Sequence, residues 1–137
     1  MLEINDSIFE KMRYEHRWVK DEVFHILDKD QTVKICAKAF NEKPITDFQR
    51  DSYKKLKHDF DTIIEQCWNL ISDYSAKFYS MELKDKSKIG EMIKLTHVIF
   101  MQDGDTILLF DAKFDLENGI GIQIYPDFEI GPQDTFL

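Results

Sequence analysis

The fold of this chain depends on a stretch without glycine or proline that reads TDFQRDSYKKLKHDFDTIIEQCWNLISDYSAKFY over residues 46–79. Thr46 and Gln49 have the spacing of a capping box, in which two side chains satisfy backbone N–H groups at the start of a helix. Apolar residues such as Ile63 then recur at steps of three and four, the period of a helix with one buried face. We therefore expect one continuous amphipathic helix from Thr46 to Tyr79.

A helix of this length needs more than one neighbour to cover its apolar face. At about 1.5 Å per residue it extends roughly 50 Å. Three stretches before it alternate apolar and polar side chains, as β-strands with two unequal faces do. These stretches are residues 8–14, 18–27 and 32–40. In the third, Val33, Ile35, Ala37 and Ala39 share one face, where the small alanines allow the helix to approach closely.

The chain after the helix predicts a short helix and further strands. The short helix is expected at residues 87–94, and the strands at residues 96–101, 106–110, 120–125 and 128–130. The Asp103-Gly104 dipeptide between two apolar runs is typical of a hairpin turn. The order is therefore three strands, a long helix with a short one after it, and three or four strands. This order predicts a single domain, residues 1–137, of the α+β class, with mostly antiparallel sheet packed on the central helix.

Composition indicates a globular protein that crosses no membrane. The 137 residues are 43% hydrophobic and 32% charged, and no apolar run is long enough to span a bilayer. The first residues lack the basic and apolar segments of a secretory signal. Cys36 and Cys67 are too few for a disulfide framework, so we expect buried thiols and a cytoplasmic location.

Negative charge is concentrated at the C-terminal end. The net charge is −8, and residues 101–137 contain eight acidic residues against one lysine, an excess of seven. A nucleic-acid site needs a positive surface, so we do not expect nucleic acid as a partner. A basic protein is the better complement. The alternative is an acidic surface that only keeps the protein in solution.

Motifs of common catalytic and cofactor sites are absent. The sequence contains no phosphate-binding loop, nucleophile elbow, zinc-binding helix or paired-cysteine motif. Its four histidines lie on different predicted elements. We therefore expect no metal and no cofactor.

One dense group of polar residues lies in the stretch DAKFDLENGIGI, residues 111–122. Its acids suggest a calcium loop, but Lys113 or Gly119 occupies a position where the EF-hand pattern needs an oxygen ligand. Hydrolysis by Asp115 or Glu117 would need an apolar cleft that separates their pKa values. The structural alternative is a tight turn, because the Asn-Gly dipeptide favours positive φ.

The same stretch resembles the signature of an uncharacterised bacterial family, a domain of unknown function. The family pattern runs D-x-E-[HN]-G-[IL]-G-[IV] and closes on Q-D, which is similar to residues 115–122 and to Gln133-Asp134 here. Trp18 in an N-terminal hairpin and the helix start at residues 45–49 are similar too. The resemblance implies a compact bacterial domain without an established activity. Asn118 stands where many relatives carry His, which weakens a catalytic role for a His at that position.

Three hypotheses about function follow. The first is a non-enzymatic module that binds a basic protein through its acidic C-terminal face; by analogy with small acidic bacterial proteins, this partner could be a toxin that it neutralises. The second is a small hydrolase that uses Asp115, Glu117 or a distant His. The third is a structural or regulatory subunit with an uncovered apolar surface. The candidate binding residues are Asp111, Asp115, Glu117, Asn118, Gln133 and Asp134, with no catalytic residue assigned.

Overall fold

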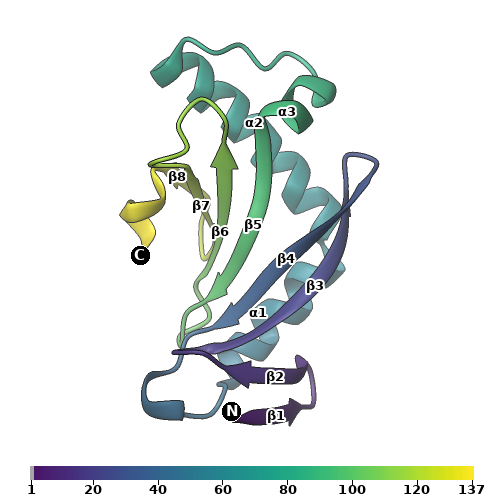
Figure 1. The fold of residues 1–137 in the computed structure, drawn as a ribbon, viewed down its shortest axis with the longest axis vertical. Coiled ribbons are helices and arrows are strands. Elements are labelled where there is room, and N and C mark those ends of the chain that lie inside the picture. Colours follow the sequence, from purple (N-terminus) through teal and green to yellow (C-terminus); the bar gives the residue numbers. More distant parts are fainter. Residues whose placement is uncertain (1) are drawn as a thin grey trace.

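The computed structural model describes residues 2–137 and shows an eight-stranded sheet with helices along one face (Figure 1). The strands are β1 (Glu3–Asp6), β2 (Glu10–Tyr14), β3 (Trp18–Ile26), β4 (Lys29–Ala37), β5 (Ile93–Phe100), β6 (Thr106–Ala112), β7 (Ile120–Tyr125) and β8 (Glu129–Gly131). The helices are α1 (Asp47–His58), α2 (Phe60–Tyr79) and α3 (Lys86–Met92), with two short 3-10 segments, η1 (Phe40–Glu42) and η2 (Gln133–Phe136). The predicted α+β class is confirmed.

The strands follow one another across the sheet in the order of the sequence. Every neighbouring pair is antiparallel except β4 and β5, which are parallel because the three helices return the chain to the same end of the sheet. This parallel pair joins the strands before the helices to those after them. The strands predicted before and after the helices therefore belong to one continuous sheet.

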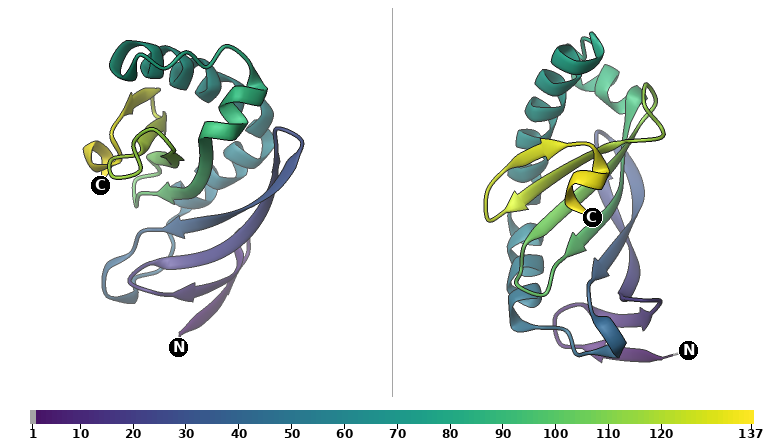
Figure 2. Two further views of the ribbon diagram at one scale, coloured as in Figure 1. Left: turned by 45° about the horizontal axis from the view of Figure 1, so that its top comes forward. Right: turned by 90° about the vertical axis from the view of Figure 1, so that its left-hand side faces the viewer.

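The predicted single helix is divided at Asp59. This residue has φ −104° and ψ 16°, outside the helical region, and it separates α1 from α2. Hydrogen bonds of helical spacing continue on both sides, from Asp59 N–H to the Lys55 carbonyl (2.9 Å) and from Ile63 N–H to the Asp59 carbonyl (3.0 Å). Aspartate has a low helix propensity. The prediction of one uninterrupted helix is therefore wrong at this residue, and α1 and α2 follow each other along the sheet (Figure 2).

The predicted capping box is confirmed and also fixes the parallel strand pair. Thr46 Oγ1 accepts a hydrogen bond from Gln49 N–H (3.2 Å), and Gln49 Oε1 accepts one from Thr46 N–H (2.9 Å). The buried Gln49 amide also donates to the carbonyls of Lys38 (2.9 Å) and Phe100 (3.0 Å). One side chain thus starts α1 and holds the adjacent ends of β4 and β5.

The N-terminal region has one strand more than the sequence predicted. β1 is a short antiparallel partner of β2. The Asp6 carboxylate accepts hydrogen bonds from the N–H groups of Ile8 and Phe9 (both 3.0 Å) in the turn between them. Arg50 of α1 contacts the other oxygen of Asp6 (2.7 and 2.9 Å) and so fastens this hairpin to the helix.

The main core lies between the helices and the inner face of the sheet. Val33, Ile35, Ala37 and Ala39 are buried in it, as the alternation of this strand predicts. Trp68 of α2 packs edge-on against Phe110 of β6, with ring centroids 5.9 Å apart.

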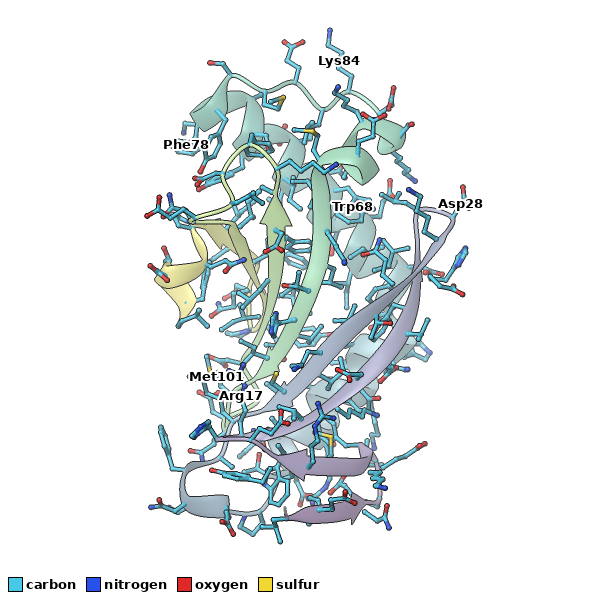
Figure 3. All side chains as sticks on the ribbon, in the orientation of Figure 1. Arg17, Asp28, Trp68, Phe78, Lys84 and Met101 are labelled. Atoms are coloured by element: carbon cyan, nitrogen blue, oxygen red, sulfur yellow. The ribbon has the colours of Figure 1, made fainter. Side chains whose placement is uncertain are left out.

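A smaller cluster lies on the opposite face of the sheet, the face turned towards the viewer in Figure 3. Its buried members are Val19, Cys36, Ile99, Ile107 and Leu109, with Met101 and Phe136 packed against them. These five side chains are buried, so they do not form the uncovered apolar surface expected of the third hypothesis. No helix within residues 2–137 is long and apolar enough to cross a membrane.

Candidate functional site

The loop between β6 and β7 is organised by Asp115. Its carboxylate accepts hydrogen bonds from the Tyr79 hydroxyl at the end of α2 (2.6 Å) and from the backbone N–H of Asn118 (3.2 Å). These hydrogen bonds lower the pKa of Asp115. The Gly119 N–H donates to the Asp115 carbonyl (2.9 Å), and Gly119 has a φ of +58°. The turn predicted from the Asn-Gly dipeptide is confirmed.

The C-terminal Gln-Asp segment packs on this loop. Gln133 donates from its side-chain amide to the Phe110 carbonyl (2.8 Å) and from its backbone N–H to the Asn118 carbonyl (3.1 Å). Its side chain lies over Gly119, where a Cβ atom would come within 2.7 Å of Gln133 Cδ and 2.8 Å of the Phe110 carbonyl oxygen. The two parts of the sequence signature therefore form one structural unit that requires glycine at its centre.

The structure divides the six predicted binding residues into two sets. Three form hydrogen bonds within the unit just described: Asp115, Asn118 and Gln133. The other three have exposed side chains, as Asn118 also does: Asp111, Glu117 and Asp134. Asp111 lies on β6 opposite Lys94 of β5. Glu117 precedes Asn118 in the chain, and Asp134 follows Gln133. Because Gln133 and Asn118 are hydrogen-bonded, Glu117 and Asp134 lie on segments that contact each other.

Acidic side chains of the C-terminal third have no cationic side chain within ion-pair distance in residues 2–137. Within residues 2–137, none of the eight carboxylates after residue 100 forms an ion pair. Four of them are exposed on the β6–β7 loop, the β7–β8 hairpin and η2, and we call them the C-terminal acidic surface: Glu117, Asp127, Glu129 and Asp134. The β6–β7 loop and the β7–β8 turn lie at opposite ends of β7, and η2 lies beside this hairpin (Figure 2).

Asp115 and Glu117 lack the arrangement of a catalytic acid and base. A carboxyl that donates a proton near neutral pH needs a raised pKa, which an apolar cleft provides. The pKa of Asp115 is instead lowered by its hydrogen bonds, and the Glu117 side chain is exposed. The geometry therefore gives no support to hydrolysis by this pair.

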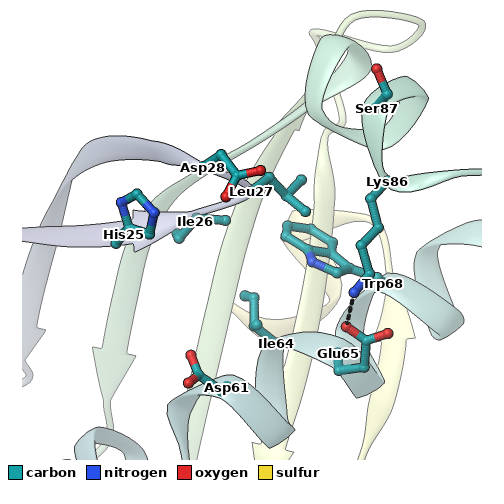
Figure 4. Close-up of a pocket in the computed structure, with 10 residues that line it drawn as sticks. All are labelled: His25, Ile26, Leu27, Asp28, Asp61, Ile64, Glu65, Trp68, Lys86 and Ser87. Atoms are coloured by element: carbon teal, nitrogen blue, oxygen red, sulfur yellow. Dashed lines mark ion pairs between the residues drawn. The ribbon is translucent and has the colours of Figure 1, made fainter.

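A cleft of about 530 Å³, which we call the hairpin–helix cleft, opens between the β3–β4 turn and helices α2 and α3 (Figure 4). Strands β4 and β5 pair only from Lys34 and His97 onward, and they diverge towards their N-terminal ends (Figure 1). The cleft lies at this end of the strands. Its apolar wall is formed by Ile26, Leu27, Ile64 and Trp68.

Exposed carboxylates line the same cleft. They belong to Asp28 in the β3–β4 turn and to Asp61 and Glu65 on α2. Glu65 pairs with Lys86 (2.9 Å), as Figure 4 shows. Asp28 and Asp61 form no ion pair with any residue in the described range 2–137. Sequence reasoning missed this cleft. The sequence does place Asp61 and Glu65 four residues apart, which brings them side by side on α2.

A further polar cluster between β3 and α1 was also missed. Lys20 donates to the Phe9 carbonyl (2.6 Å) and the Tyr53 hydroxyl (2.8 Å), while Glu22 pairs with Lys20 (3.4 Å) and Lys57. Burial lowers the pKa of Lys20 and raises that of Tyr53 to about 12. Because Lys20 and Glu22 bond to groups of the protein itself, this cluster stabilises the packing of α1 on the sheet.

No group of three or more His, Cys, Asp or Glu side chains in residues 2–137 is placed to hold a metal ion. Both cysteines are buried and unpaired, and burial raises the pKa of each thiol, to about 12 for Cys67. Neither thiol is placed to act as a nucleophile or a metal ligand, since both roles require an accessible thiolate.

These features define an α+β domain with an acidic C-terminal unit and no recognisable catalytic constellation among residues 2–137. Residues 8–137 match the family DUF6985, a domain of unknown function, so the chain belongs to this family. No curated protein and no solved structure matches the chain.

Proposed function

We propose that this chain is a non-enzymatic binding module whose C-terminal acidic surface contacts a basic protein. The supporting observation is that the carboxylates of this surface are exposed and form no ion pair within residues 2–137. Unpaired carboxylates on one side of a protein attract a cationic partner over distances near the Debye length, about 8 Å at physiological salt. A toxin neutralised by this module would be one such partner.

A firm scaffold beneath these carboxylates also supports the proposal. Gln133 and Asp115 connect η2, the β6–β7 loop and the end of α2 through hydrogen bonds of 2.6–3.2 Å. Side chains on such a framework lose less freedom on binding than side chains on a flexible tail. Asp115 contributes to this framework, so it is left intact when the surface is tested.

The test removes charge from the C-terminal acidic surface without changing side-chain size. The surface variant replaces Glu117→Gln, Asp127→Asn, Glu129→Gln and Asp134→Asn. A matched control replaces Glu10→Gln, Glu42→Gln, Asp51→Asn and Asp73→Asn, which are also exposed and unpaired in residues 2–137. Each variant has a net charge of −4, because four negative charges are removed from −8.

Immobilised wild type and both variants are incubated with lysate of the source organism at low and high salt. We expect a basic protein to be retained by wild type and by the control, to be lost from the surface variant, and to be released by salt. Equal loss from both variants would mean that only net charge matters. Retention by the surface variant would refute the proposed contact.

A further inference from the structure

We propose that the hairpin–helix cleft binds a guanidinium group carried on a short alkyl chain, the chemistry of an arginine side chain. This site is separate from the C-terminal acidic surface and does not depend on the proposed function. Its volume, about 530 Å³, falls within the roughly 300–1,000 Å³ of typical small-ligand sites. It combines an apolar wall with two carboxylates, Asp28 and Asp61, that form no ion pair within residues 2–137.

Unpaired charge in the cleft favours a cationic ligand. Lys86 is already paired with Glu65 at 2.9 Å, so it offers little attraction to an anion. Asp28 and Asp61 come from opposite sides of the cleft, the hairpin turn and α2 (Figure 4), and neither is paired within residues 2–137. A guanidinium presents several N–H donors in one plane and can bond to more than one carboxylate.

The apolar wall accounts for the alkyl chain. Ile64 and Trp68 lie one turn apart on α2, and Ile26 and Leu27 face them from the hairpin. Long basic side chains bury their methylene groups on such surfaces and keep the charged end in a polar environment. A purely apolar ligand is disfavoured because it would displace water from the carboxylates without bonding to them.

Two probes of equal shape and different charge test the proposal. Butylguanidinium carries the positive charge, and butylurea is its neutral analogue. Binding is followed by the indole N–H resonances in NMR spectra of the full chain. Trp68 lines the cleft, while Trp18 lies at the opposite end of β3 and serves as an internal control; Trp68→Phe assigns the two signals.

We expect the Trp68 resonance to shift saturably with butylguanidinium, the Trp18 resonance to stay in place, and butylurea to have no effect. The double variant Asp28→Asn, Asp61→Asn should bind about 2- to 30-fold more weakly, because it loses two exposed charge pairs. Asparagine suits residue 28, whose φ is 65°. The control double variant Asp51→Asn, Asp73→Asn keeps the cleft unchanged and should bind as wild type does.

The source of the guanidinium is then distinguished with the peptide acetyl-Gly-Arg-Gly-amide. Binding as tight as that of butylguanidinium indicates an arginine of a protein, and binding of butylguanidinium alone indicates a free small cation. Both results support a guanidinium site. A stationary Trp68 resonance, equal binding of butylurea, or unchanged affinity in the Asp28, Asp61 double variant would overturn it.

Discussion

Replacing Gly119 with alanine should destabilise the protein through two separable effects. Gly119 has a φ of +58°, and an L-residue with a side chain in this region costs about 1–2 kcal/mol. The added Cβ would also lie 2.7 Å from Gln133 Cδ, so the Gln133 amide must move. That movement breaks its 2.8 Å hydrogen bond to the Phe110 carbonyl, with a net loss of about 1 kcal/mol. We expect a total loss of about 2–3 kcal/mol.

A double-mutant cycle separates the two effects. Urea denaturation gives the free energy of unfolding of wild type, Gly119→Ala, Gln133→Ala and the double variant. With the Gln133 amide removed, Gly119→Ala should cost less. What remains is the conformational part of about 1–2 kcal/mol and the close approach of the Cβ to the Phe110 carbonyl oxygen. The same cost in both backgrounds would contradict the contact between residue 119 and Gln133. A cost below about 0.5 kcal/mol would contradict the whole account of this turn, because ordinary surface substitutions fall within that range.

Three further predictions concern the fold. Ile63→Asp introduces a charge at a core position that is 5% exposed, so it should cost several kcal/mol and abolish cooperative thermal unfolding; a native-like melt would argue against the position of α2. Burial alone would raise the pKa of Asp6, but hydrogen bonds from Arg50 and two backbone N–H groups lower it overall. Stability should therefore be lost as pH falls below about 4 through this lowered pKa, and Arg50→Met should reduce that pH dependence and cost about 1.5–3 kcal/mol at pH 7. Cys36 and Cys67 are completely buried, so both should resist iodoacetamide in the native protein and react once urea unfolds it; rapid native labelling would show that the core opens.

The C-terminal signature shows what local sequence patterns leave undecided about the candidate site. Sequence reasoning selected four residues within 111–118, together with Gln133 and Asp134, because acids, an Asn-Gly turn and a family pattern coincide there. It could not tell which of these side chains bond within the protein. Asp115 meets Tyr79 across 36 positions of sequence, and Gln133 meets Phe110 across 23. No local pattern encodes such contacts.

The sequence by itself determined the elements whose causes are local. The capping box at Thr46, the alternation in β4 and the positive φ at Gly119 each follow from residues within a few positions of one another. The tertiary structure alone decided the parallel pairing of β4 with β5 and the hairpin–helix cleft. Both bring together segments separated by an entire helical crossover, and hydrophobic periodicity states which face of an element is buried without stating its neighbour.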